Sequence, residues 1–191
     1  MPLQSFRDSK QVVEFAYHGT YQETAEIICI KGEGFKITPT TDPIINSNLW
    51  FGEGIYFYDG DDRKAKDWPK RAQPGNRVAI IQSRIRLGVM LDVQTLDGQD
   101  AIKSAYETIK RNDEIPRNQI TDATVIDFLA KVLKFDTVRG TGRLSNNRIP
   151  SEIYTGSNLV RFKALIICVK NVAMIEQSII VWSGTKEREQ P

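Results

Sequence analysis

The chain has 191 residues, enough for one domain with a proper core and too few for two ordinary ones, so we expect residues 1–191 to form a single domain. Its 26 Lys and Arg residues nearly balance its 24 Asp and Glu residues, and a net charge of +2 favours no particular class of partner. Two cysteines and one histidine argue against a disulfide framework and against the usual zinc sites. The sequence has no long apolar run, which argues against a secretory signal and a membrane span. Together these features favour a cytoplasmic protein.

The first predicted element is a strand at Val12–His18, which is rich in β-branched and aromatic residues. It ends at Gly19, a natural place for backbone that is exposed to a ligand. Thr20 and Glu23 have the spacing of a capping box, so we expect a helix to begin there. His18 is the only histidine, and a structural histidine at a strand end is the plain alternative to a functional one.

An aromatic stretch follows at Asn48–Asp59, with five aromatic residues and two glycines among twelve residues. Ile55–Tyr58 reads as a short strand that directs Tyr56 to one side and Phe57 to the other. One ring can then join the core while the other lines a cleft and stacks on a planar ligand. An edge strand with a glycine bulge is the alternative interpretation.

The remaining pattern alternates helices and strands. In chain order we expect a short basic helix after Asp61 and Asp62 that contains Trp68, a strand at Val78–Leu87, helices at Asp100–Arg111 and Thr121–Lys134, strands at Phe135–Arg139, from Ser151, at Ala164–Val169 and at Ser178–Trp182, and a frayed tail at Gly184–Pro191.

Three segments together form one pattern. Tyr17-His18-Gly19-Thr20, Gly52-Glu53-Gly54-Ile55-Tyr56-Phe57 and Ser151-Glu152-Ile153-Tyr154 resemble, in order and spacing, the H-Y-E set of PARP-like ADP-ribosyltransferases. Phe51–Phe57 is similar to the FGxGIYF signature of that family. The helical segment Asp100–Lys134 lies outside the resemblance.

The resemblance implies an α+β fold of two packed antiparallel β-sheets, a split β-sandwich with flanking helices, that holds NAD as co-substrate without a metal. His18 would hold a ribose hydroxyl of NAD, and the backbone at Gly19 would receive the nicotinamide carboxamide. Thr20 is a further candidate cofactor-binding residue. Tyr56 would stack on the nicotinamide ring. Glu152 would bind the nicotinamide ribose and stabilise the oxocarbenium-like charge that develops as the glycosidic bond breaks.

Two positions depart from the family pattern. Lys64 stands where the family has its carboxamide-binding serine, and Asp67 stands where it has a second stacking aromatic. Trp68 follows directly after the position at which the family has this second aromatic. Either the helix is shifted by one residue so that Trp68 supplies the second ring, or the nicotinamide is held on one side only.

The acceptor is predicted from the loop before the glutamate, which carries three arginines and two asparagines and no acid. Its candidate acceptor-binding residues are Arg139, Arg143, Asn146, Asn147 and Arg148. Such side chains bind phosphates and base edges, so single-stranded RNA is the hypothesis for the acceptor. A solvated basic loop that touches the NAD pyrophosphate is the alternative.

We therefore expect a monomeric NAD-dependent mono-ADP-ribosyltransferase. By analogy with stand-alone bacterial members, it would act as a toxin of a defence system with an antitoxin protein as partner. Three alternatives stay open: a transferase that modifies proteins; a non-catalytic module that binds NAD, ADP-ribose or RNA; and another chemistry, either hydrolysis of NAD or removal of a 2′-phosphate from RNA.

Overall fold

The computed structural model describes residues 8–37, 50–67, 75–112, 116, 119–141 and 164–185. Its elements, in chain order, are β1 (Asp8–Tyr21), α1 (Gln22–Cys29), β2 (Ile55–Asp59), α3 (Asp62–Asp67), β3 (Arg77–Asp92), α4 (Leu96–Asn112), α5 (Asp122–Leu133), β4 (Thr137–Thr141), β5 (Leu165–Val169), the short 3-10 helix Val172–Met174 and β6 (Ile175–Thr185). Among these helices, none is both long and apolar enough to cross a membrane.

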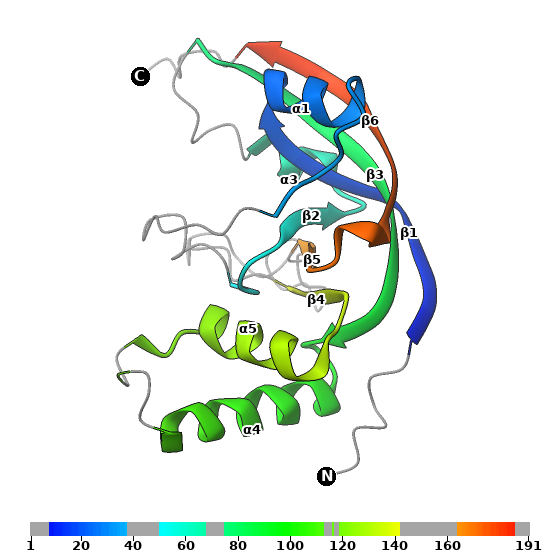
Figure 1. Ribbon diagram of the computed structural model, residues 1–191. Helices are drawn as coiled ribbons and strands as arrows, with labels where there is room; N and C mark the ends of the chain where they lie inside the picture. The colour runs from blue at the N-terminus through cyan, green and yellow to red at the C-terminus, as the bar shows by residue number, and fades with distance from the viewer. Residues whose placement is uncertain are drawn as a thin grey trace, which may run out of the picture.

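The described strands form one six-stranded sheet in the order β1-β2-β5-β4-β3-β6, and β1 also pairs with β3. The pairings of β1, β2, β5, β4 and β3 therefore form a closed circuit, with β6 added along β3. In Figure 1 the long strands β1, β3 and β6 curve along one side of the molecule, β2, β5 and β4 lie inside the curve, and α4 and α5 pack beside β4.

This architecture confirms the expected α+β class and differs from the expected pair of separate antiparallel sheets. The reason is the length of β3, which has sixteen residues. Its residues 77–85 pair with β6, and its last three residues pair with β4. The long strand thus joins what would otherwise be two sheets, and its pairing with β4 is parallel.

Two apolar clusters lie on opposite faces of β2 and β5. On β2, Phe57 belongs to the first cluster, whereas Tyr56 packs against the second. On β5, Ile167 belongs to the first cluster and Cys168 to the second, as the alternation of side chains along a strand requires. The second cluster is completed by α4 and α5, which contribute Ala105, Ile109, Val125, Ile126 and Leu129. The helical hairpin therefore covers the face of the sheet that carries Tyr56.

The start of α1 differs from the prediction. Thr20 is buried near the end of β1, and the helix begins at Gln22 after Tyr21, whose side chain makes no capping hydrogen bond. The expected capping box at Thr20 and Glu23 is wrong because β1 continues to pair with β3 as far as Tyr21↔Val78.

Other boundaries are closer to expectation. The helix expected after Asp61 and Asp62 is present as α3, which begins at Asp62, and Asp61 Oδ1 accepts the backbone N–H of Arg63 at 3.1 Å. A capping box does occur at α5, where the Thr121 side chain accepts the N–H of Thr124 at 3.2 Å. The strand expected at Phe135–Arg139 is present two residues later as β4.

Candidate functional site

His18 lies near the end of β1, and its Nδ1 is 2.8 Å from the carbonyl oxygen of Tyr56 in β2. Its ring also meets those of Phe35 and Phe57, with centroids 5.4 and 5.6 Å away. Burial lowers the pKa of His18 below its ordinary value of 6.5, and the bond to the Tyr56 carbonyl offsets part of that shift. The ring is therefore neutral at pH 7. Because a carbonyl can only accept, Nδ1 carries the proton and Nε2 is the acceptor nitrogen.

The pairing between β1 and β2 ends just before Gly19. The last paired residues are Tyr17 and Tyr58. The Phe15 carbonyl accepts the N–H of Gly60 at 2.8 Å, so the polar backbone groups of Phe15 point toward β2. These groups alternate in direction along an antiparallel strand, so those of Tyr17 and then Gly19 point the same way. The N–H and C=O of Gly19 thus face β2 at a position that β2 does not pair.

Tyr56 is the residue that regular pairing would set opposite Gly19. Its carbonyl instead accepts the side chain of His18. The imidazole therefore takes the place of a backbone donor at the point where the two strands part.

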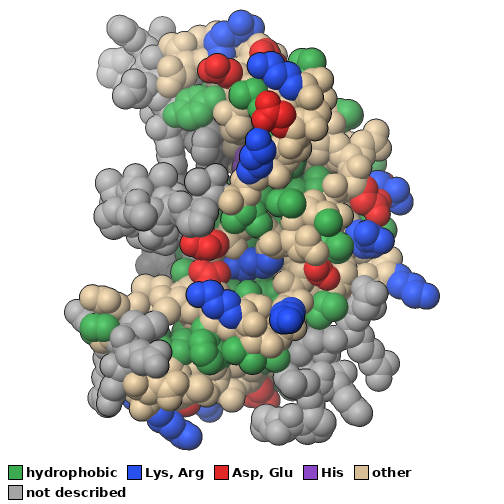
Figure 2. Space-filling model, in the orientation of Figure 1, with side chains coloured by type: hydrophobic (Ala, Val, Ile, Leu, Met, Phe, Trp, Pro, Cys, Tyr) green, Lys and Arg blue, Asp and Glu red, His purple; other side chains and the backbone are tan. Residues whose placement is uncertain are grey.

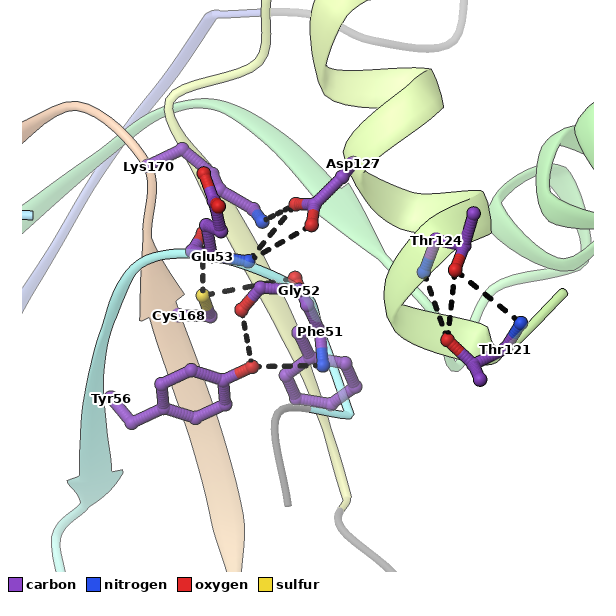
Figure 3. Close-up of polar contacts among 9 residues, drawn as sticks. All are labelled: Phe51, Gly52, Glu53, Tyr56, Thr121, Thr124, Asp127, Cys168 and Lys170. Atoms are coloured by element: carbon purple, nitrogen blue, oxygen red, sulfur yellow. Dashed lines mark hydrogen bonds and ion pairs between the residues drawn. The ribbon is translucent and has the colours of Figure 1, made fainter. Parts of the chain in front are cut away.

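The phenol of Tyr56 points toward the turn that precedes β2 (Figure 3). It lies on the face of β2 opposite to Phe57, whose ring His18 contacts. Its hydroxyl donates to the Gly52 carbonyl at 2.7 Å and accepts the Phe51 N–H at 3.0 Å. Its ring is parallel to that of Phe51, with centroids 6.4 Å apart and planes 2° apart. Burial raises the pKa of the Tyr56 hydroxyl, so it stays protonated. The hydroxyl thus serves the turn, and the ring packs against the second apolar cluster.

The glycines of this turn have packing reasons. Gly52 has φ +73°, and a Cβ there would collide with the carboxylate of Asp127 from α5. A Cβ on Gly54 would lie 2.8 Å from the carbonyl oxygen of Val169. The glycine pattern is therefore required by close approach of other elements to the backbone.

Asp127 binds the turn directly. Its two carboxylate oxygens accept the backbone N–H of Glu53 at 3.0 and 3.1 Å, and Oδ1 also receives Nζ of Lys170 at 2.6 Å (Figure 3). The Lys170 side chain is only 9% exposed, so Asp127 is the counter-ion that makes its burial tolerable.

Cys168 holds the same turn from β5. Its Sγ lies 3.9 Å from the Phe51 carbonyl and 3.8 Å from the Glu53 carbonyl, within reach of weak S–H hydrogen bonds. Burial raises the pKa of Cys168 to about 12, which keeps the thiol protonated and able to donate.

Sequence reasoning missed these three residues, Asp127, Cys168 and Lys170. The available signal was an acid inside the apolar half of a helix, between Ile126 and Phe128. A charged residue in such a position needs a partner, and the lysine that ends the apolar run of β5 was a candidate.

The other predicted site residues are only partly described. Lys64 lies in α3, where its N–H donates to Asp61 Oδ1 at 3.4 Å. Arg139 lies in β4 rather than in a loop, and its guanidinium forms an ion pair with Asp59 at 3.2 Å. Its Nε is buried and has no hydrogen-bond partner among the residues that the structure describes. Arg139 is therefore paired with Asp59 within the sheet, and its contact with an acceptor stays a prediction.

Several predictions fall outside the described residues and stay predictions: Trp68, Arg143, Asn146, Asn147, Arg148 and Glu152. On the described surface in Figure 2, acidic and basic side chains are interspersed, and neither sign forms a large patch on this face. Within the described ranges, no three His, Cys, Asp or Glu side chains gather in a way that could hold a metal ion.

Comparison with known proteins adds no family. No protein-family model matches the chain, and no curated protein matches it significantly. The resemblance to PARP-like transferases therefore rests on the sequence motifs.

Proposed function

We propose that this protein is an NAD-dependent ADP-ribosyltransferase that breaks the bond between nicotinamide and ribose. The observation that supports this proposal is the 2.8 Å contact between His18 Nδ1 and the Tyr56 carbonyl. It joins the His-Gly-Thr strand to the Gly-Ile-Tyr-Phe strand at the point where their regular pairing ends.

The polar groups at this point match the nicotinamide end of NAD. A carboxamide has one acceptor oxygen and one NH₂ donor, and the Gly19 N–H and C=O form the complementary pair, as an unpaired strand edge does for a peptide. A ribose hydroxyl can donate to Nε2 of the neutral His18 ring. Stacking of the Tyr56 ring on nicotinamide stays a prediction from the sequence, because that ring packs on the face of β2 opposite to Phe57, which His18 contacts.

Glu152 would complete the reaction. As the glycosidic bond breaks, its electron pair leaves with nicotinamide and positive charge develops on the ribose carbon. A carboxylate beside the ribose stabilises that charge, and the nucleophile of the acceptor then attacks the same carbon. Glu152 remains a sequence prediction in this scheme, and its position is what the experiment must test.

The experiment measures nicotinamide release from NAD by the purified chain. Single-stranded RNA, a mixture of proteins and buffer alone serve as acceptor arms, and intact mass identifies any ADP-ribosylated product. We expect release by the wild type, and a loss on the order of 10²- to 10³-fold for Glu152→Gln and for His18→Ala. Glu107→Gln on α4 is the matched control for charge removal, and its release should equal that of the wild type.

Each result has a distinct meaning. Absence of nicotinamide release in every arm, or equal release by wild type and Glu152→Gln, would overturn the proposed function. NAD binding without release would favour the non-catalytic binding module. Release of free ADP-ribose in all arms would identify hydrolysis, with water as the acceptor.

A further inference from the structure

We propose that Asp127 is a positioning residue for the NAD site: through the backbone of Glu53 it fixes the turn to which the Tyr56 hydroxyl is bound. This inference rests on the proposed function for its catalytic consequence. It concerns the helical hairpin α4–α5, which lies in the segment outside the resemblance to PARP-like transferases.

The turn, residues Phe51–Glu53, is held by side chains from three elements. Tyr56 of β2 binds the Phe51 N–H and the Gly52 carbonyl. Cys168 of β5 approaches the Phe51 and Glu53 carbonyls. Asp127 of α5 takes the Glu53 N–H (Figure 3). Each of these five polar backbone groups thus contacts one of three side chains, and the turn has little freedom to change conformation.

Asp127 is the strongest of these partners. Its contact with Glu53 is charge-assisted and involves both carboxylate oxygens, whereas the thiol contacts of Cys168 are long and weak. The absence of a side chain on Gly52 is what allows the carboxylate to approach. Lys170 then neutralises the charge that this approach buries. A carboxylate that served only as the counter-ion of Lys170 would not need to accept the backbone N–H of Glu53.

The consequence for the site is geometric. The Tyr56 hydroxyl is bonded to two of the three residues of the turn, so a turn that relaxes takes the ring plane with it. Displacement of about 1 Å in a substrate-positioning group can lower a rate on the order of 10²-fold. Asp127 would therefore affect turnover without touching NAD.

The test compares two double variants, Asp127→Asn/Lys170→Met and Asp127→Leu/Lys170→Met. Both remove the two charges together, so neither leaves a buried charge unpaired. Asn and Leu have similar shapes, but only the Asn amide oxygen can accept the Glu53 N–H. The difference between the two proteins therefore reports the hydrogen bond to the turn. Asp127→Ala/Lys170→Met is a third protein, which removes the acceptor without adding apolar bulk and is used if the Leu variant does not fold.

The measurements are kcat and KM for nicotinamide release, the melting temperature, and hydrogen exchange of the Glu53 amide by NMR. We expect the Asn variant to keep most of the wild-type kcat, and the Leu or Ala variant to lose kcat/KM on the order of 10²-fold at a similar melting temperature. The Glu53 amide should exchange faster in the Leu or Ala variant only.

Equal turnover of the Asn and Leu variants would overturn the inference, as would equal exchange of the Glu53 amide. If the wild type itself releases no nicotinamide, the proposed function fails. The amide exchange still decides whether Asp127 orders the turn, because it is measured without NAD.

Discussion

The Tyr56 hydroxyl gives a direct test of how the glycine turn is held. The change Tyr56→Phe removes one oxygen and keeps the ring that is parallel to Phe51. In the wild type this oxygen accepts the Phe51 N–H and donates to the Gly52 carbonyl, so its removal leaves both backbone groups without their partner. Phe51 is only 5% exposed, which limits the access of water to them.

The expected cost follows from the two bonds lost. Each contributes about 0.5–1.5 kcal/mol to the free energy of unfolding, which gives a destabilisation of about 1–3 kcal/mol. With a urea m-value of about 2 kcal/mol/M, the unfolding midpoint should fall by about 0.5–1.5 M. The m-value itself should not change, because the folded state buries the same surface.

The assay is urea unfolding followed by fluorescence, with Tyr106→Phe as the matched control. Tyr106 lies on α4 and is 39% exposed, so loss of its hydroxyl should change the free energy of unfolding by less than about 0.5 kcal/mol. Equal midpoints for wild type and Tyr56→Phe would refute the reasoning, since they would mean that the turn does not depend on the phenol.

Three further predictions test neighbouring features. Of the two cysteines, only Cys29 should react with a thiol reagent at pH 8 before urea is added, because Cys168 is fully buried with its pKa raised to about 12. The free energy of unfolding should hold above pH 6.5 and fall below it, because the unfolded chain then protonates the His18 imidazole, which the fold keeps neutral. In thermal melts, the melting temperature of His18→Gln should fall less with pH than that of the wild type. Gly54→Ala should lower stability by about 1–3 kcal/mol more than Gly32→Ala, because both glycines have positive φ but only Gly54 meets other atoms.

Much of the secondary structure could be predicted from local patterns. The strands β2 and β5 are short apolar or aromatic runs bounded by glycines and polar residues, and α5 carries an apolar stripe behind a threonine cap. The alternation of Tyr56 and Phe57 between two faces also follows from strand geometry alone. These features need only the neighbouring residues.

The features that were missed depend on residues distant in sequence. Thr20 has the local signature of a helix cap, but pairing of β1 with β3 keeps it in the strand. The extension of β3 to Asp92 depends on β4, whose pairing with it is set by tertiary structure. The contact of Asp127 with Glu53 spans 74 positions, and no local pattern encodes it.

The glycine turn and the histidine carry different weight for function. The glycines at 52 and 54 are explained by packing alone, since Asp127 and the β5 backbone occupy the space of their side chains. That motif would therefore be needed in this fold even without a ligand.

His18 differs, because its ring makes a hydrogen bond to the Tyr56 carbonyl in addition to its contacts with Phe35 and Phe57. Regular pairing of Gly19 with Tyr56 would satisfy the Tyr56 carbonyl by a backbone N–H, without burial of an imidazole. Instead the pairing with β2 ends at Tyr17, and the Gly19 backbone faces a part of β1 that β2 does not pair. An arrangement that forgoes a backbone hydrogen bond and lowers the pKa of a buried histidine costs stability, and this cost is the observation that motivates the proposed ligand site.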